Sequence, residues 1–126
     1  MAIIQVDFGD GKWCISPDPC RVEVNTPLLW HLRCRRTSIA RLRWTLYFNS
    51  GTPFFEWHHQ PQSHFLVTTE LQNSGIDTKD FGDHAGAVGP LIPSEPGTYK
   101  YGLRLEDAES GEPIGDDDPQ LIIVPY

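Results

Sequence analysis

The 126-residue sequence lacks any hydrophobic run close to the ~18 apolar residues that a membrane-spanning helix needs. Its first seven residues also lack the basic segment and long apolar stretch of a secretory signal. We therefore expect a soluble, cytoplasmic protein that does not bind a membrane. The length fits one domain, so we predict a single unit over residues 1–126.

Cysteine is scarce, with Cys14, Cys20 and Cys34 the three present. An odd number without the spacing of a redox or zinc motif does not predict a disulfide framework. We expect these residues to be reduced, structural thiols. The sequence also lacks the Gly-x-Ser-x-Gly elbow of serine hydrolases, and the Gly86–Gly89 stretch lacks the Lys-Ser/Thr of a phosphate-binding loop. No class of enzymatic reaction is favoured, and we lean toward a protein that is not an enzyme.

Positive charge is scarce in the second half of the chain. Residues 1–60 carry seven Lys/Arg against five Asp/Glu, whereas residues 61–126 carry three against twelve. An acidic chain with a net charge of −7 argues against nucleic-acid binding, which depends on many phosphate contacts. A difference of this size between the halves is typical of an interaction surface.

Helical segments are not predicted, because the 11 prolines interrupt almost every window that is long enough. The dominant pattern is an alternation of apolar and polar residues, which indicates half-buried strands. It is clearest in Ile39–Phe48 and in Thr98–Glu106. Shorter strands are predicted at Ile3–Phe8, Arg21–Val24, Leu28–Cys34, Phe54–His58, Phe65–Thr69 and Gln120–Val124.

These short strands predict an all-β fold, a single antiparallel Greek-key β-sandwich of about seven to nine strands. Two long connections separate them. We expect residues 70–96 to cross between the two sheets, with a functional loop as the alternative. The acidic segment 106–119 is expected to form a solvated hairpin or an Ω-type loop.

Pro96-Gly97-Thr98-Tyr99-Lys100-Tyr101 resembles the segment that precedes the copper-binding cysteine of cupredoxins, and residues 17–30 are similar to their opening pair of strands. Gly97-x-Tyr99 also resembles the tyrosine corner of immunoglobulin-like sandwiches, in which the hydroxyl caps a nearby backbone group. Both resemblances imply a Greek-key sandwich.

The resemblance does not extend to the metal site. The position of the copper-binding cysteine is Leu103, and residues 102–126 contain no Cys, His or Met. A type 1 copper site needs a thiolate and two imidazoles, so blue-copper electron transfer is excluded. The immunoglobulin-like resemblance implies that Tyr101 stands in place of the paired cysteine.

Two sets of residues are candidates for a functional site. Arginines surround the segment 36–38 and would share one solvent face if Leu28–Cys34 and Ile39–Phe48 paired as a hairpin; such a patch can bind carboxylates or phosphates. The alternative is that they pair with the chain's own acidic residues. The predicted partner-binding set is Arg33, Arg35, Arg36, Arg41 and Arg43.

The second set is a group of histidines that could bind Zn or Cu across a turn, with exposed histidines around a turn as the alternative. The predicted ligands are His58, His59, His64 and His84. We expect no cofactor and a non-catalytic binding or assembly module, whose protein partner or second copy docks on the arginine-rich hairpin. The alternatives are a metal-binding protein that uses His59, His64 and His84, and an enzyme that binds a small acidic ligand at the arginines.

Overall fold

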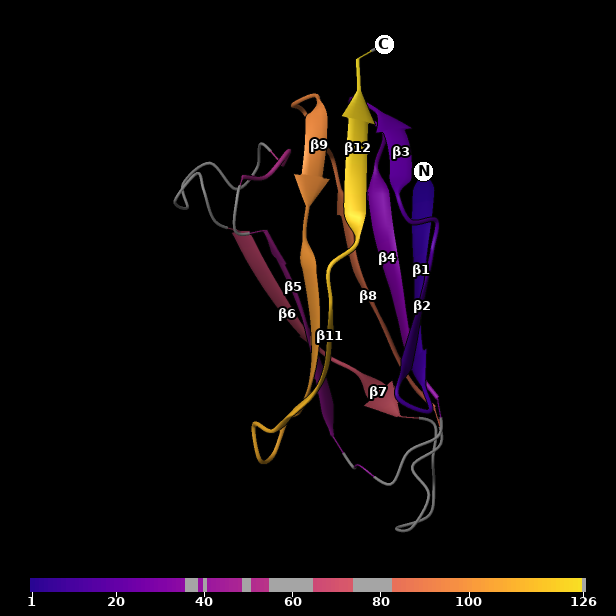
Figure 1. Ribbon diagram of the computed structural model, residues 1–126, viewed down its shortest axis with the longest axis vertical. Coiled ribbons are helices and arrows are strands. Elements are labelled where there is room, and N and C mark those ends of the chain that lie inside the picture. Colours follow the sequence, from indigo (N-terminus) through magenta and orange to yellow (C-terminus); the bar gives the residue numbers. More distant parts are fainter. Residues whose placement is uncertain (36–38, 40, 49–50, 55–64, 74–82, 126) are drawn as a thin grey trace.

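A computed structural model describes residues 1–35, 39, 41–48, 51–54, 65–73 and 83–125. These residues form strands and connections and contain no helix, so none that could cross a membrane (Figure 1). The strands are β1 (Ala2–Gly9), β2 (Lys12–Ser16), β3 (Cys20–Glu23), β4 (Leu28–Cys34), β5 (Leu42–Phe48), β6 (Phe65–Glu70), β7 (Gln72–Asn73), β8 (His84–Leu91), β9 (Gly97–Lys100), β10 (Gly102–Asp107), β11 (Pro113–Asp117) and β12 (Gln120–Val124).

One layer of the sandwich is a five-stranded sheet in the order β2-β1-β4-β8-β7. β1 pairs with β2 in the antiparallel direction and with β4 in the parallel direction. Alternate residues of β4 are buried, from Leu28 through Trp30 and Leu32 to Cys34, because this sheet turns one face to the core and the other to solvent.

The other layer consists of two sheets, and the chain passes directly from strands of one into strands of the other. The four-stranded sheet has the order β11-β10-β5-β6, and the three-stranded sheet has the order β3-β12-β9. Only Tyr101 separates β9 from β10, and Asp118 and Pro119 separate β11 from β12, so the chain passes from one sheet to the other at both places. In Figure 1, β9 and β12 therefore lie at one end of the molecule and β5 and β11 extend toward the other.

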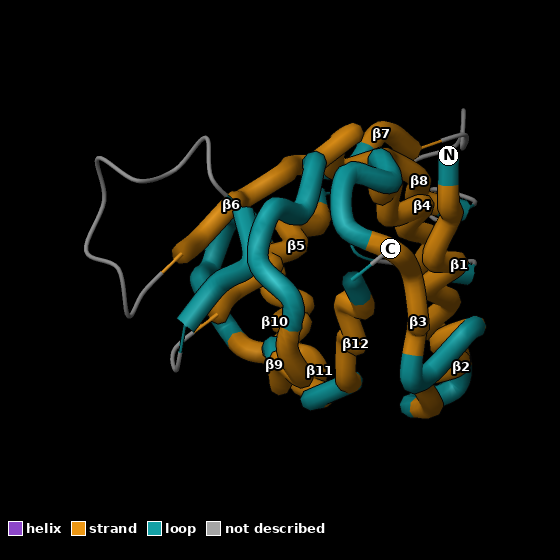
Figure 2. Tube along the Cα trace, turned by 90° about the horizontal axis from the view of Figure 1, so that it is seen from above, coloured by secondary structure: helices purple, strands orange, loops and turns teal. Residues whose placement is uncertain are grey.

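The hydrophobic core fills the space between the layers, which enclose it in the view of Figure 2. Its largest fully buried side chains include Trp30 on the five-stranded sheet and Trp44 and Phe48 on β5. Trp30 and Tyr101 meet edge to face at 5.8 Å, and Tyr101 stacks on Phe48 at 5.2 Å. Aromatic rings from both layers thus hold the sandwich together.

The predicted all-β sandwich is confirmed, and most predicted strands are present. The prediction of purely antiparallel pairing is wrong, because β1 pairs with β4 and β3 with β12 in the parallel direction, and the described strands run to β12, more than the seven to nine predicted. Thr98–Glu106 is divided in two at Tyr101, and Leu28–Cys34 has the predicted bounds. Of the predicted strand Phe54–His58, Phe54 forms an isolated bridge with Pro93, and residues 55–58 lie outside the described part of the chain. The expected hairpin in the acidic segment is formed by β10 and β11.

Four strands have no counterpart among the predicted strand ranges, namely β2, β7, β8 and β11, although β11 lies in the segment expected to form a hairpin or a loop. The most consequential is β8, which lies in the segment expected to be only a connection. It pairs along the whole of β4, with Trp30 opposite Val88 and Cys34 opposite His84.

The tyrosine corner implied by the resemblance is present as a hydrogen bond. The Tyr99 hydroxyl donates to the carbonyl oxygen of Glu95 at 3.1 Å. Gly97 has a φ of +153°, and a Cβ there would lie 3.3 Å from the Tyr99 ring. Tyr101 and Leu103 are both buried in the core.

Candidate functional site

The structure separates the predicted arginine set between the two layers. Arg33 lies on β4 in the five-stranded sheet, whereas Arg43 lies on β5 in the four-stranded sheet, with Arg41 just before it. The predicted hairpin is wrong, because β4 is paired on both sides by β1 and β8, and β5 by β10 and β6. Arg36 lies outside the described residues.

Three of these arginines form ion pairs with the chain's own carboxylates. Arg41 makes two contacts with Glu70, of 2.7 and 3.1 Å, and Arg43 contacts Glu106 at 3.2 Å. Arg33 lies 3.8 Å from Asp7 and 3.4 Å from Asp83. The alternative of internal pairing therefore accounts for Arg33, Arg41 and Arg43.

The solvent face of the four-stranded sheet continues this pattern of internal pairing. The hydroxyl of Tyr47 donates to Asp116 at 2.9 Å, and the guanidinium of Arg104 lies 3.6 Å from the same carboxylate and 5.2 Å from the Tyr47 ring centre. Burial raises the pKa of the Tyr47 phenol, and the bond to Asp116 adds to this. Tyr47, Arg104 and Asp116 on this face are therefore paired with one another.

The predicted metal ligands are represented in the described chain by His84 alone. Its side chain is fully buried at the start of β8, opposite Cys34. His58, His59 and His64 lie outside the described residues, so the histidine hypothesis stays a prediction. Within the part of the chain that the structure describes, no group of three or more His, Cys, Asp or Glu side chains could hold a metal ion.

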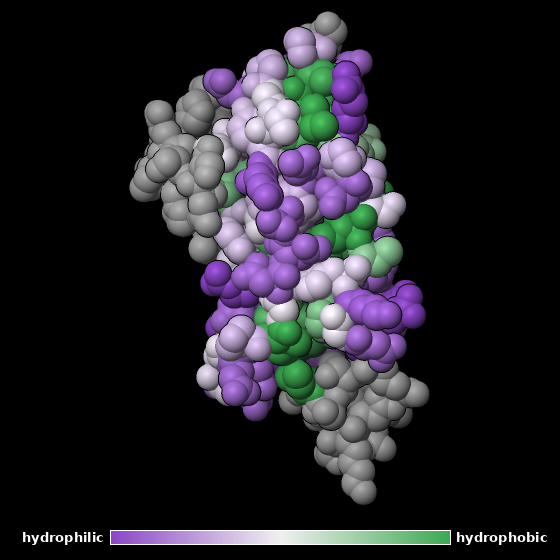
Figure 3. All heavy atoms as spheres, viewed as in Figure 1, coloured by the Kyte–Doolittle hydropathy of each residue, from purple (hydrophilic) through white to green (hydrophobic). Residues whose placement is uncertain are grey.

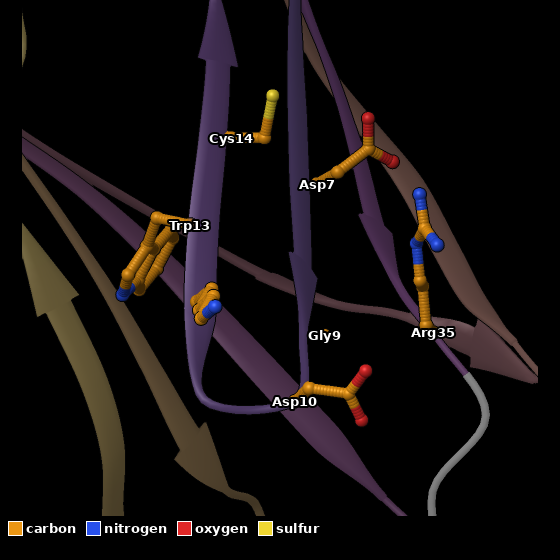
Figure 4. Close-up of a pocket in the computed structure, with 7 residues that line it drawn as sticks. Asp7, Gly9, Asp10, Trp13, Cys14 and Arg35 are labelled. Carbon is orange, nitrogen blue, oxygen red and sulfur yellow. The ribbon is translucent and has the colours of Figure 1, made fainter.

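A hollow of about 160 Å³ lies beside the turn between β1 and β2 (Figure 4). It is lined by two acidic and two basic side chains and by Gly9, Trp13 and Cys14. Arg35 extends toward Asp7 in this view, and its stem lies so close over Gly9 that a Cβ there would be 2.8 Å from the Arg35 Cδ. The charged lining residues are Asp7, Asp10, Lys12 and Arg35.

Arg35 differs from the other described arginines of the predicted set. Neither Arg35 nor Lys12 forms an ion pair with another described residue, whereas Arg33, Arg41 and Arg43 all do. Both cations line the same hollow: Lys12 is on the edge strand of the five-stranded sheet, whereas Arg35 follows β4, on the far side of β1. They are the described basic groups of this region that are open to a carboxylate from outside.

That edge strand is β2, which among the described strands pairs with β1 alone. Asp10 and Gly11 have φ angles of 51° and 72°, so they form the two-residue turn typical of tight hairpins, closed by Gly9 and Lys12. Residues opposite each other alternate between hydrogen-bonded and non-hydrogen-bonded pairs along such a ladder. Trp13 opposite Phe8, and Ile15 opposite Val6, are therefore non-hydrogen-bonded pairs.

The main-chain groups of Trp13 and Ile15 consequently point away from β1, toward the free edge. The hydrogen bonding of Phe8, which lies opposite Trp13, agrees with this assignment: its carbonyl points away from β2 and accepts a hydrogen bond of 2.8 Å from the Arg35 N–H on the β4 side. Among the described residues, neither Trp13 nor Ile15 has a main-chain partner on the free edge. Solvent or another strand must therefore satisfy these donors and acceptors.

The inward side chains of β2 are apolar and half-buried. Trp13 makes edge-to-face contacts with Phe8 and Trp44, each at 5.0 Å between ring centres. It also covers Gly115 of β11, where a Cβ would lie 3.1 Å from the indole nitrogen. Trp13 therefore packs between the two layers at this edge. Because Trp13 and Ile15 are only partly buried, they leave apolar surface exposed along β2.

The β2 edge was missed in the sequence, although two signals mark it. Asp10-Gly11 is a strong signal for a two-residue hairpin turn, and Trp13 and Ile15 alternate with Lys12, Cys14 and Ser16 immediately after it. Together they place an antiparallel partner directly after the first strand.

The surface seen in Figure 3 is mainly hydrophilic, with separate hydrophobic patches. A second hollow, of about 330 Å³, is open and acidic and is lined by Tyr47 and residues Asp116, Asp117 and Asp118. Within the described chain, neither hollow is an enclosed apolar pocket of the kind that surrounds a small-molecule substrate.

No protein-family model and no curated protein matches the sequence. Among solved structures, the chain is similar to a cysteine protease inhibitor from Entamoeba histolytica, with 10% identity, a TM-score of 0.42 and coverage of 97% of both chains. It is similar to the N-terminal domain of a phage TP901-1 protein, with 7% identity, a TM-score of 0.40 and coverage of 98% of both chains. It is also similar to auracyanin A, a blue copper protein from Chloroflexus aurantiacus, with 12% identity, a TM-score of 0.37 and coverage of 98% of this chain and 100% of the other.

Proposed function

We propose that this chain is a non-catalytic β-sandwich module that binds a protein partner by adding an extended segment of that partner to the free edge of β2. The observation that carries the proposal is the open main chain of Trp13 and Ile15, on a strand that the described part of the chain pairs on one side only. Each added residue that faces this edge would satisfy a donor and an acceptor that the described chain leaves to solvent.

Side chains on both faces of the edge support this mode of binding. On the inner face, Trp13 and Ile15 offer half-buried apolar surface that a side chain of the added strand would cover. On the outer face, Lys12 and Arg35 lie beside the hollow, where they could bind a carboxylate of the partner. This retains, for Arg35, the predicted role of the arginine set in binding an acidic partner.

The neighbouring edge of the opposite layer is less suited to strand addition. β11 begins with Pro113, which has no N–H to donate, and carries Asp116 and Asp117. Proline and charged side chains on an edge oppose pairing with another strand. β2 carries a single charged residue, Lys12, at its start, so its edge is the more open of the two.

The proposal is tested with a defined probe, a synthetic heptapeptide of alternating threonine and valine that ends in glutamate. We expect it to slow the amide hydrogen exchange of Trp13 and Ile15, measured by NMR, and to leave Cys14 unchanged, because the Cys14 N–H faces β1. Alternate amides of one strand thus serve as target and control.

Ile15→Pro removes a donor from the free edge without removing a hydrogen bond to β1. We expect this variant to lose peptide binding, whereas the matched variant Cys14→Ser keeps it; circular dichroism checks that both are folded. Exchange that slows equally at all amides of β2, or only in another sheet, would contradict the proposal.

A further inference from the structure

We infer that the partner at this edge is a second copy of this chain, whose β2 pairs antiparallel with the first β2 about a two-fold axis through Cys14. The inference rests on the proposed function, because it uses the same free edge. It names the occupant and the register, so it can fail while binding of another strand survives.

The register follows from which groups face the edge. A two-fold axis through Cys14 places Trp13 of one copy opposite Ile15 of the other, and these are the two residues whose main-chain groups point outward. They would form hydrogen-bonded pairs, once on each side of the axis. Cys14 is also the midpoint of Lys12–Ser16, so this register alone pairs every residue of both strands. The contact is then the same for both copies, as a closed dimer requires.

The side chains of β2 are compatible with their own copy in this register. On the inner face, Trp13 would lie beside Ile15 of the second copy, and each would cover apolar surface that is half-exposed in the single chain. On the outer face, Lys12 would lie opposite Ser16, so no like charges meet. The two lysines would be four residues apart, ~13 Å at ~3.3 Å per residue, which exceeds the ~8 Å Debye length of physiological salt.

The pairing of five-residue strands predicts a weak dimer. Stable interfaces bury roughly 1,200–2,000 Å², more than one pair of short strands covers. We therefore expect a dimer that forms at high protein concentration and dissociates on dilution. The resulting sheet would be continuous through both copies, since each β2 would then be paired on both sides.

Cys14 provides a built-in reporter of this register. It is exposed, whereas Cys20 and Cys34 are buried. In the dimer, the two Cys14 residues would form a non-hydrogen-bonded pair with Cα atoms ~4.5 Å apart, which lies within the ~4.4–6.8 Å range of disulfides. Oxidation of the concentrated protein should therefore join the two copies at this position.

The experiment compares single changes at the edge, with diamide as the oxidant that accepts the two thiol hydrogens. We expect wild-type protein to form a disulfide dimer on a non-reducing gel, increasingly with concentration, and Cys14→Ser to form none. In the Cys14→Ser background, Lys12→Cys mixed with Ser16→Cys should cross-link several-fold more than Lys12→Cys alone. Ile15→Pro in the wild-type background should reduce the Cys14 cross-link to the level of random collisions.

Each alternative outcome overturns the inference. Equal cross-linking of Lys12→Cys with itself and with Ser16→Cys would show collision without register. A monomer by sedimentation at every concentration, together with no cross-link, would show that the chain does not pair with itself. If the threonine–valine peptide still protects Trp13 and Ile15 in that case, the proposed strand addition stands and only the second copy is excluded; if the peptide fails as well, both fail.

Discussion

The indole N–H of Trp30 donates a hydrogen bond of 3.2 Å to the hydroxyl of Tyr101, 71 positions further along the chain. Trp30 belongs to the five-stranded sheet, and Tyr101 lies between β9 and β10 in the opposite layer. Both side chains are buried, so this bond joins the two layers inside the core. Burial also raises the pKa of the Tyr101 phenol well above its ordinary value, although the bond from Trp30 partly opposes this.

Replacing Tyr101 with phenylalanine should leave the Trp30 donor buried without its acceptor. We expect Tyr101→Phe to lower the free energy of unfolding by about 1–3 kcal/mol, the usual cost of an unsatisfied buried group. Urea denaturation measures the change. The matched control is Tyr99→Phe, which removes the exposed Tyr99 hydroxyl that donates to the Glu95 carbonyl oxygen. This change should lower the free energy of unfolding by less. Equal losses in the two variants would contradict the role assigned to the Trp30–Tyr101 bond.

Gly102 leaves the space that the Tyr47 ring occupies on the neighbouring strand. A Cβ at Gly102 would collide with that ring, because Gly102 and Tyr47 are directly opposite in the β10–β5 pair. We expect Gly102→Ala to cost about 1–3 kcal/mol of stability in urea denaturation, as other overpacked sites do.

The collision with the Tyr47 ring can be separated from other effects of the added methyl group on stability. Tyr47→Ser removes the ring, so the Gly102→Ala change should cost less in a Tyr47→Ser background than in the wild type. A double-mutant cycle measures this coupling. Additive losses would show that the methyl group meets no obstacle at Tyr47.

The ion pair between Arg41 and Glu70 should appear in the titration of the carboxylate. The hydrogen bond from Arg41 is the main cause that lowers the pKa of Glu70 from 4.5. We expect Arg41→Gln to raise this pKa toward its ordinary value, measured by NMR of the side-chain carboxyl carbon. Arg43→Gln should have a smaller effect, because Arg43 bonds to Glu106 and acts on Glu70 only through its charge.

The same pKa gives the sign of the pH effect. A carboxylate with a lowered pKa in the folded chain stabilises the fold above the unfolded value, and this contribution is lost as the pH falls through the folded value. Wild-type protein and Arg41→Gln should therefore become more alike in stability below pH 4.5. A constant difference would mean that the Arg41–Glu70 pair does not contribute to folding.

Alternation in the sequence was enough to predict the strands whose one face is apolar and bulky. β4 and β5 have alternate large apolar residues, including Trp30 and Trp44, and both were predicted. β8 was missed because Ala85, Gly86 and Ala87 have low strand propensity. Its strand structure comes from pairing with β4, which no local pattern in the sequence contains.

Pairing between strands was harder to predict than the strands themselves. Consecutive strands usually pair, which favoured a hairpin of β4 with β5, but β4 lies between β1 and β8. Because of this difference, Arg33 and Arg43 lie in different layers. Arginines that are close in the sequence therefore predicted a patch, but the fold places them apart.

The last prediction concerns Cys34, whose thiol is buried on β4. Burial is the main cause that raises the pKa of this thiol from 9.0 to about 11, and the negative charge of Asp83 adds to it. A raised pKa in the folded chain means that its contribution to stability is fully present below pH 9 and is lost as the pH rises toward 11, because the unfolded chain ionises first.

We therefore expect the difference in stability between wild-type protein and Cys34→Ala to decrease as the pH rises from 9.0 to about 11. Urea denaturation at several pH values measures this difference, in which the titration of all other groups cancels. Cys14→Ala is the control, because Cys14 is exposed and its difference from wild type should show no such decrease. A difference for Cys34→Ala that does not change with pH would contradict the buried position of this thiol.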